Sequence, residues 1–446
     1  MQYMLISNKK GEKETMKKKL LALLLSTAMI ATCATGCGSN SSSSSTSGTS
    51  TAPSAGADAT PIDVTLTVWS PQEEQNTYDQ APDGLLQTMC ENFNEAHPEW
   101  NITFEYGVCA EGDAKDTVTK DVAAAADVYM YANDQIPTLV EAGALSQLGG
   151  DTLTDIQENQ PETMVNTVTY NGGVYGVPFT SNTWFMYYDK SKFTEDEITS
   201  LDTMMAKDLG KGVTNVAFPL NNSWYIASFF YAGGGTLFGD GTDASAGTNF
   251  GELTDVTDYL VDLAANKKFV NDADGLAIAR MKEGTLGAMF SGSWDAATLS
   301  EALGDNFGCA QLPTVTIGDK TESLKSFAGS KAIGVNPNCE NQEVAVALAA
   351  YLGSEEAQQL RFEAREVIPT NNNVANSDAV KASAVASAQA NTIANTSVGQ
   401  PLLQEMGSYW DPAASLGNEL VQGDVTHDNS AEKTKAFGEG VVSSGL

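Results

Sequence analysis

The chain has 446 residues and a net charge of −33 at pH 7, with 57 acidic residues against 24 basic ones. This charge argues against a partner that is itself anionic, such as a nucleic acid or an anionic membrane surface. The length is sufficient for one large domain or two ordinary domains with well-buried cores.

The first 36 residues have the features of a secretory signal. Three lysines at positions 17–19 precede the apolar run LLALLLSTAMIA, which is too short to span a bilayer. Met16 is a suitable start for this signal, so residues 1–15 are interpreted as an upstream extension. Removing residues 1–36 takes away six lysines and two glutamates and leaves a net charge of −37.

The segment ATGC at residues 34–37 resembles a bacterial lipobox, in which the cysteine is lipidated and becomes the mature N-terminus. We therefore expect Cys37 to carry a lipid anchor, with Cys33 as a weaker competing position, because Ala34 stands where the pattern prefers leucine. An ordinary cleaved signal is the alternative. Residues 37–60 are small and polar and cannot bury enough apolar surface to fold, so we expect a disordered tether.

The mature chain alternates short apolar strands with amphipathic helices, a pattern typical of an α/β fold. Residues 63–70 (DVTLTVWS) and 101–109 (NITFEYGVC) alternate with period two and are predicted to be strands. The segment between them carries apolar residues at helical spacing and stops at Pro98, which completes a βαβ unit. Residues 126–132 (ADVYMYA) are expected to form a third strand, followed by a helix that ends near Gly143.

Further along, residues 172–193 (GGVYGVPFTSNTWFMYYDKSKF) are apolar but contain an interrupting glycine and proline, so we expect two strands joined across a hinge. Residues 341–352 (NQEVAVALAAYL) are predicted to be helical. A second helix is expected to follow from Ser354, a good N-cap residue with two glutamates in the first turn.

The remaining cysteines, Cys90, Cys109, Cys309 and Cys339, form no C-x-x-C pair and match no zinc pattern. Cys90 with Cys109 is the first disulfide to test, and free buried thiols are an equally open alternative. The chain has two histidines and no G-x-S-x-G elbow, so catalysis by a nucleophile and a base has little support. No cofactor and no metal ion are expected.

Aromatic residues beside polar ones are the most informative feature. A sugar ring presents an apolar face and a rim of hydroxyls, so its site needs flat aromatic platforms with carboxylates and amides around them. Five of the six tryptophans have polar residues as close neighbours. Any single tryptophan is more often part of a core, but their coincidence predicts a carbohydrate site. The segments are VWSPQEE, YMYANDQ, TSNTWF, NNSWY, SGSWD and MGSYWD.

From Asp63 to the C-terminus the chain resembles the family 1 extracellular solute-binding proteins of ABC importers, most closely the maltose and maltodextrin binders. The similarity is an ordered set of weak motifs: LTVWS, ADVYMYANDQIPTLVEAGAL, GGVYGVPFTSNTWFMYYDK, EGTLGAMFSGSWD, QLPT, SFAGSKAIGVN and AVALAAYLGSEEAQ followed by VIPTN. It implies a two-lobed α/β fold of the type II periplasmic-binding-protein class, with the ligand cleft between the lobes. Hinges are implied near residues 180–185, 328–335 and 371–376.

The resemblance also implies lobes that are each assembled from two parts of the sequence. The N-lobe would comprise residues 61–180 plus 333–375, and the C-lobe residues 181–332 plus 376–446. By motif position it implies that aromatic, acidic and amide residues of both lobes face the sugar: Trp69, Glu73, Glu74, Tyr131, Asp134, Asn182, Asn222, Trp224, Tyr225, Trp294 and Trp410.

The resemblance thus implies a binding protein rather than an enzyme: a lipid-anchored monomer on the extracellular face of a Gram-positive bacterial membrane. It would capture malto-oligosaccharides and deliver them to the permease of an ABC importer. The amides Asn133, Gln135, Asn182 and Asn222 stand where maltose binders often carry charged rim groups, so glycan length and linkage stay open. The alternatives are a binder of another oligosaccharide or small solute, such as an amine or a metal, and a glycoside hydrolase that uses two carboxylates.

Overall fold

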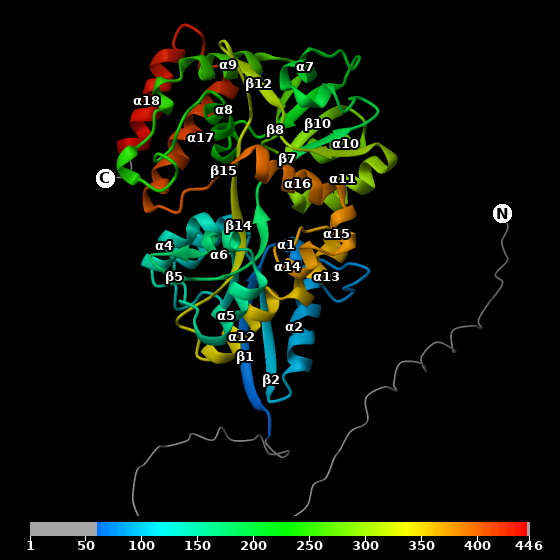
Figure 1. Cartoon of the computed structure of the whole chain (residues 1–446), viewed down its shortest axis with the longest axis vertical. Helices are drawn as coiled ribbons and strands as arrows, with labels where there is room; N and C mark the ends of the chain where they lie inside the picture. Colours follow the sequence, from blue (N-terminus) through cyan, green and yellow to red (C-terminus); the bar gives the residue numbers. More distant parts are fainter. Residues whose placement is uncertain (1–59, 444–446) are drawn as a thin grey trace, which may run out of the picture. The chain divides into compact units, whose positions relative to one another are not determined.

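The computed structural model describes residues 60–443, which belong to one compact unit built on two β-sheets surrounded by helices (Figure 1). The expected signal, Cys37 and the tether up to residue 59 lie outside these residues. Between residues 60 and 443, no helix combines the length and the apolar character that crossing a bilayer requires.

The first sheet has six strands in the order β15, β14, β3, β1 and β2, with β6 also paired to β14. β1 is parallel to both β2 and β3, whereas β14 is antiparallel to β3 and β6. The strands are β1 (Ile62–Ser70), β2 (Trp100–Val108), β3 (Val128–Ala132), β6 (Val177–Asn182), β14 (Ser326–Val335) and β15 (Ser397–Gly399).

The predicted βαβ unit is confirmed by β1, helix α2 (Leu85–Ala96) and β2. The two strands pair in parallel over their whole length, from Ile62 with Trp100 to Ser70 with Val108. α2 buries apolar side chains at helical spacing, from Leu85 to Phe93. It packs this face on the sheet and ends before Pro98, as the sequence pattern predicts.

The third predicted strand is confirmed as β3, whose residues are all buried. The helix predicted after it ends before Gly143, as expected, but its first turn is a 3-10 turn, η2 (Asn133–Gln135). The α-helical part, α4 (Ile136–Glu141), is therefore short. Gly143 has a φ of 66°, a left-handed conformation that glycine adopts without strain and that stops the helix.

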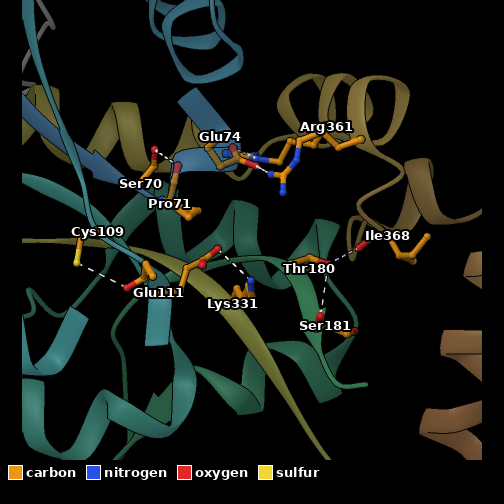
Figure 2. Close-up of polar contacts among 12 residues, drawn as sticks. Ser70, Pro71, Glu74, Cys109, Glu111, Thr180, Ser181, Lys331, Arg361 and Ile368 are labelled. Carbon is orange, nitrogen blue, oxygen red and sulfur yellow. Dashed lines mark hydrogen bonds and ion pairs between the residues drawn. The ribbon is translucent and has the colours of Figure 1, made fainter. Parts of the chain in front are cut away.

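The chain passes from the first sheet to the second between β6 and β7 (Phe185–Asp189). Separate strands are present as predicted, but the expected position of the break was wrong for Pro178, which lies inside β6, and the chain leaves this strand at residues 183–184. Thr180 on β6 donates a hydrogen bond from Oγ1 to the carbonyl oxygen of Ile368 at 2.7 Å (Figure 2). This bond ties the crossing strand to the later connection that follows α13 (Glu355–Arg365).

The second sheet has five strands in the order β11, β7, β10, β8 and β9. β10 is parallel to β8 and antiparallel to β7. Besides β7, the strands of this sheet are β8 (Thr214–Phe218), β9 (Phe269–Asn271), β10 (Leu286–Ser291) and β11 (Phe307–Ala310). Two hairpins lie outside both sheets: β4 (Thr169–Tyr170) with β5 (Gly173–Val174), and β12 (Thr314–Ile317) with β13 (Lys320–Ser323).

The two predicted late helices are confirmed as α12 (Gln342–Leu352) and α13. The side chain of Ser354 accepts a hydrogen bond from the backbone N–H of Ala357, which is the expected N-cap. The two glutamates of the first turn lie where the helix dipole favours negative charge.

The apolar side chains gather into one core around the first sheet and two on the faces of the second, which gives the two lobes. Helices that contribute to the first core are α2, α3 (Ala114–Val118), α4, α5 (Gly150–Asn159), α6 (Glu162–Thr167), α12 and α13. Those that contribute to the other two are α7 (Leu201–Ala206), α8 (Ser223–Ala232), α9 (Thr254–Ala265), α10 (Ala277–Lys282), α11 (Ala296–Leu303), α13 again, α14 (Asn372–Ala375), α15 (Asp378–Ala382), α16 (Ala384–Asn395), α17 (Gly407–Gln422) and α18 (Ser430–Ser443).

The four cysteines of the described residues are all free thiols. Cys90 and Cys109 both lie in the first core but form no disulfide. Of the two alternatives left open by the sequence, the structure shows free, buried or half-buried thiols. Burial raises the pKa of Cys90 to about 12, so this thiol stays protonated and unreactive at neutral pH.

Candidate ligand-binding site

A cavity of about 550 Å³ is lined by residues from both lobes. Its size is within the range of small-molecule sites, roughly 300 to 1,000 Å³. The first lobe contributes the segments after β1, β2 and β3, and the second contributes the first turns of α8 and α17 and the turn after β10. Both lobes therefore supply side chains to one site.

The structure brings together eight of the eleven residues that we expected to face the ligand. They are Glu73, Glu74, Asp134, Asn182, Asn222, Trp224, Trp294 and Trp410. Whether they bind a sugar stays a prediction, but their convergence from six separate segments supplies the aromatic and polar groups that a sugar site requires.

Trp69, Tyr131 and Tyr225 do not line this cavity. Trp69 lies across Gly107 of β2, where an added Cβ would come within 2.4 Å of the indole. Tyr131 is fully buried and donates its hydroxyl to the carbonyl oxygen of Tyr175 at 3.1 Å. Tyr225 follows Trp224 on α8, and one step along a helix turns its side chain inward onto Trp184, with ring centroids 4.8 Å apart.

The aromatic wall of the cavity is built on two helix starts and one turn. Trp224 lies in the first turn of α8, and Asn222 caps this helix by accepting the backbone N–H of Trp224 at 2.9 Å. Trp294 lies in the 3-10 turn η6 (Ser293–Asp295), with its ring centroid 6.1 Å from that of Trp224 and an angle of 29° between the planes. Trp410 lies in the first turn of α17, and its carbonyl oxygen accepts from Ser223.

A glycine is required beside Trp294. A Cβ at Gly292 would lie 2.0 Å from an indole carbon of Trp294, so the ring can fold back over the backbone only because the side chain is absent. The carbonyl oxygen of Gly292 accepts from the buried hydroxyl of Tyr187 at 2.9 Å. Together these contacts fix the turn that carries the platform.

Glu73 and Glu74 are neighbours with different environments. Glu74 is 1% exposed and forms ion pairs with Arg361 at 2.7 Å and Arg365 at 2.6 Å (Figure 2 shows the pair with Arg361). Burial alone would raise the pKa of Glu74, but the charges and hydrogen bonds of the two arginines outweigh it and lower the pKa. Glu74 therefore anchors α1 (Gln72–Gln75) to α13, whereas Glu73 is exposed at the cavity.

Asp134 is an acid of the cavity whose pKa is displaced upward. Burial raises the pKa of Asp134 to about 7, against the smaller opposing effects of its own backbone N–H and of Lys115. Its neighbour Gln135 is structural: its side chain donates to the carbonyl oxygens of Glu111 and Gly112 at 3.0 and 2.6 Å. This amide holds the loop after β2 against the cavity.

Several charged residues that line the cavity were not identified from the sequence: Glu111, Lys115, Asp116, Lys331 and Arg365. Lys331 had a visible signal, because it is a lysine inside the apolar strand segment SFAGSKAIGVN. The others stand in loops and helices whose sequence does not show which face is buried. Among residues 60–443, no group of three or more His, Cys, Asp or Glu side chains is arranged to hold a metal ion.

Comparison with known proteins identifies the family. Residues 88–388 match the family model described as bacterial extracellular solute-binding protein. A structure solved with acarbose is 48% identical, covers 85% of this chain and 99% of its own, and superposes with a TM-score of 0.80.

Two named relatives agree with this match. The galactooligosaccharide-binding protein of Bacillus subtilis is 26% identical over 71% of this chain and 77% of its own length. The maltooligosaccharide ABC transporter solute-binding lipoprotein of Streptococcus pneumoniae is 26% identical over 72% of this chain and 78% of its own length. The resemblance to solute-binding proteins and the two-lobed fold are thus confirmed. The chain belongs to the bacterial extracellular solute-binding protein family and is a binding protein, not an enzyme.

Proposed function

We propose that the protein is the lipid-anchored substrate-binding component of a carbohydrate ABC importer and that its cleft binds malto-oligosaccharides. The observation that carries this proposal is the convergence of Trp224, Trp294 and Trp410 on one cavity that also contains carboxylates and amides. Indole faces match the apolar faces of glucose units, and the polar groups match their hydroxyls. The relatives' names support a glycan ligand.

In this proposal the ligand acts by stabilising the closed form of the cleft. A glycan in contact with Trp294 of one lobe and Glu73 of the other stabilises the arrangement in which both walls are close. The crossing strands β6 and β14 are the elements about which the lobes turn. Affinity in the micromolar range corresponds to roughly −8 kcal/mol, which a few stacked rings and paired hydroxyls can supply. The permease then recognises the closed form.

The choice of glycan is supported by two observations and opposed by one. The relative from Streptococcus pneumoniae is named for maltooligosaccharides, and the structure at 48% identity was solved with acarbose. The relative from Bacillus subtilis is named for galactooligosaccharides instead. A galactooligosaccharide is therefore the second candidate ligand.

Titration calorimetry with maltotriose, maltotetraose, acarbose and a β-galactooligosaccharide tests the proposal. We expect saturable binding of the α-glucans and of acarbose with micromolar dissociation constants. Binding of the galactooligosaccharide alone would assign the cleft to the second candidate. Heat from none of the four would contradict a glycan function for the cleft.

The anchor is a separate part of the proposal, supported by the ATGC segment and by the description of the Streptococcus pneumoniae relative as a lipoprotein. Cys37 carries the lipid and holds the protein at the outer face of the membrane. Expression of Cys37→Ala in a Gram-positive host should release the protein into the medium, while the wild type stays with the cells. Retention of the variant on the cells would contradict the assignment of Cys37.

A further inference from the structure

Lys331 is a cation that enters the cavity from a crossing strand. It lies on β14, whose residues are otherwise almost all buried, and only 17% of its side chain is exposed. The pairing of β14 with β6 shifts register between Lys331 and Ala332. Such bulges change the direction of a side chain locally, and they are often found beside functional sites.

One ammonium group contacts both walls of the cavity. Lys331 Nζ lies 3.2 Å from Glu111 Oε1, an ion pair drawn in Figure 2. Glu111 belongs to the first lobe, in the 3-10 turn η1 (Glu111–Asp113) after β2. The same Nζ lies over the ring of Trp294, which belongs to the second lobe, at 5.0 Å from the ring centroid.

The environment makes both contacts stronger than surface contacts of the same kind. The side chain of Glu111 is only 9% exposed, so solvent screens the ion pair less than at an open surface. An ammonium over an indole face is attracted by the negative charge of the ring face, and this attraction grows as water is removed. Lys331 therefore has two favourable partners that hold it in place.

Trp294 depends on such partners because its own element is short. The turn η6 has three residues, and within residues 60–443 the indole has one aromatic neighbour, Trp224, with ring centroids 6.1 Å apart. Gly292 provides the room that lets the ring fold back over the backbone. The ammonium of Lys331 is the charged group that holds the ring from the cavity side.

We propose that Lys331 is a positioning residue of the binding site, which fixes the Trp294 platform and links it to Glu111 on the opposite wall. This inference rests on the proposed function in one respect, since the orientation of the platform affects affinity only if a glycan stacks on Trp294. The link itself consists of protein groups alone. It can therefore be tested without any sugar.

The first measurement is maltotriose affinity by calorimetry in matched variants. Lys331→Met should weaken binding about tenfold, equivalent to about 1.4 kcal/mol. Lys331→Arg should stay within about threefold of the wild type, because arginine also pairs with carboxylates and stacks on aromatic rings. Lys433→Met is the control, since Lys433 pairs with Glu419 at 2.9 Å on α18 and α17, away from the cavity. It should bind as the wild type does.

The second measurement is near-ultraviolet circular dichroism of the unliganded proteins, which reports on tryptophan environments. Lys331→Met should change the tryptophan bands, and the same substitution in a Trp294→Phe background should not. Unchanged bands in Lys331→Met would overturn the inference, whatever the affinity, because a residue that only touches the ligand would leave them unaltered. The inference would also be overturned if Lys331→Met bound maltotriose as tightly as the wild type does. It would be overturned as well if Lys331→Arg lost as much affinity as Lys331→Met.

The two proposals fail in different ways. If the wild type binds no glycan, the proposed function is wrong, and the dichroism of the unliganded variants alone decides the role of Lys331. If thermal melting shows that Lys331→Met does not fold, Glu111→Gln takes its place, because it removes the charge from the same link at the opposite wall. Glu111→Gln should then give the same two changes, and wild-type values in both would overturn the inference.

Discussion

Trp184 and Trp294 stand in similar sequence contexts, TSNTWF and SGSWD, yet they have opposite surroundings. Trp184 is fully buried between Tyr225 and Phe290, with ring centroids at 4.8 and 5.4 Å. Trp294 lies half-buried at the cavity, under the ammonium of Lys331. A polar neighbour in sequence thus marks the end of a strand or a turn. The tertiary packing decides whether the tryptophan at that position points into the core, as Trp184 does, or into the cavity, as Trp294 does.

The comparison predicts that Trp184→Ala is chiefly a stability mutation. It would leave a large cavity in the second lobe, and such changes cost about 3 to 5 kcal/mol. The indole Nε1 has no hydrogen-bond partner within the described structure, so the loss comes from packing. Urea denaturation should show the decrease, and a wild-type midpoint would mean that Trp184 is less tightly packed than its burial indicates.

Trp294→Ala and Trp224→Ala should have the reverse profile. Each removes a platform from the cavity and should weaken binding of maltotriose by about 1 to 3 kcal/mol, the contribution of one aromatic face. Their urea midpoints should stay close to that of the wild type, because both rings are partly exposed. If calorimetry gave unchanged affinity for both variants, the assignment of the cleft would be wrong.

Gly292→Ala tests the role of Trp294 in the same comparison and leaves both indole side chains chemically unchanged. The new methyl group would collide with Trp294 and displace the ring, since the nearest ring carbon lies 2.0 Å from the Cβ position. We expect maltotriose affinity to fall by about 1 kcal/mol, within the range for one aromatic contact. Gly149→Ala is the matched control and should bind normally, because Gly149 has extended backbone, an added Cβ there meets no atom within 4 Å, and the residue does not line the cavity.

The last expected effect is on the pH dependence of stability and comes from Asp134 in the cavity. Because the pKa of Asp134 is raised to about 7 in the fold, the folded protein holds its proton at pH values where the unfolded chain has lost it. The contribution of this group to stability is therefore greatest below pH 4 and declines as pH rises to about 7. Asp134→Asn should remove this decline from a plot of melting temperature against pH. Parallel curves for the two proteins would contradict the assignment.

The sequence was sufficient for the elements whose local pattern is strong. The βαβ unit, β3 and the N-cap of α13 at Ser354 were all predicted from periodicity and capping chemistry. Glu74 shows where this reasoning fails, because its partners Arg361 and Arg365 lie almost 300 residues away in sequence. No local pattern indicates that the carboxylate of Glu74, and not that of Glu73, forms ion pairs with two arginines.

The same limit explains the tyrosines. Tyr131 precedes Ala132 and Tyr225 follows Trp224, and both Ala132 and Trp224 line the cavity. The alternation of side chains along β3 and the rotation along α8 direct the two tyrosine rings into the cores instead. The family resemblance identified the right segments. The side of each segment that faces the ligand required the structure.

The late position of β14 in the chain affects how the protein is made. β3 ends at residue 132, but its antiparallel partner β14 begins at residue 326 and the last strand of the sheet, β15, ends at residue 399, so the first sheet is incomplete until about nine tenths of the 446 residues have been synthesised. Pairing over such sequence separations is slow. During synthesis the leading part of the first sheet therefore lacks its final partner strands until late.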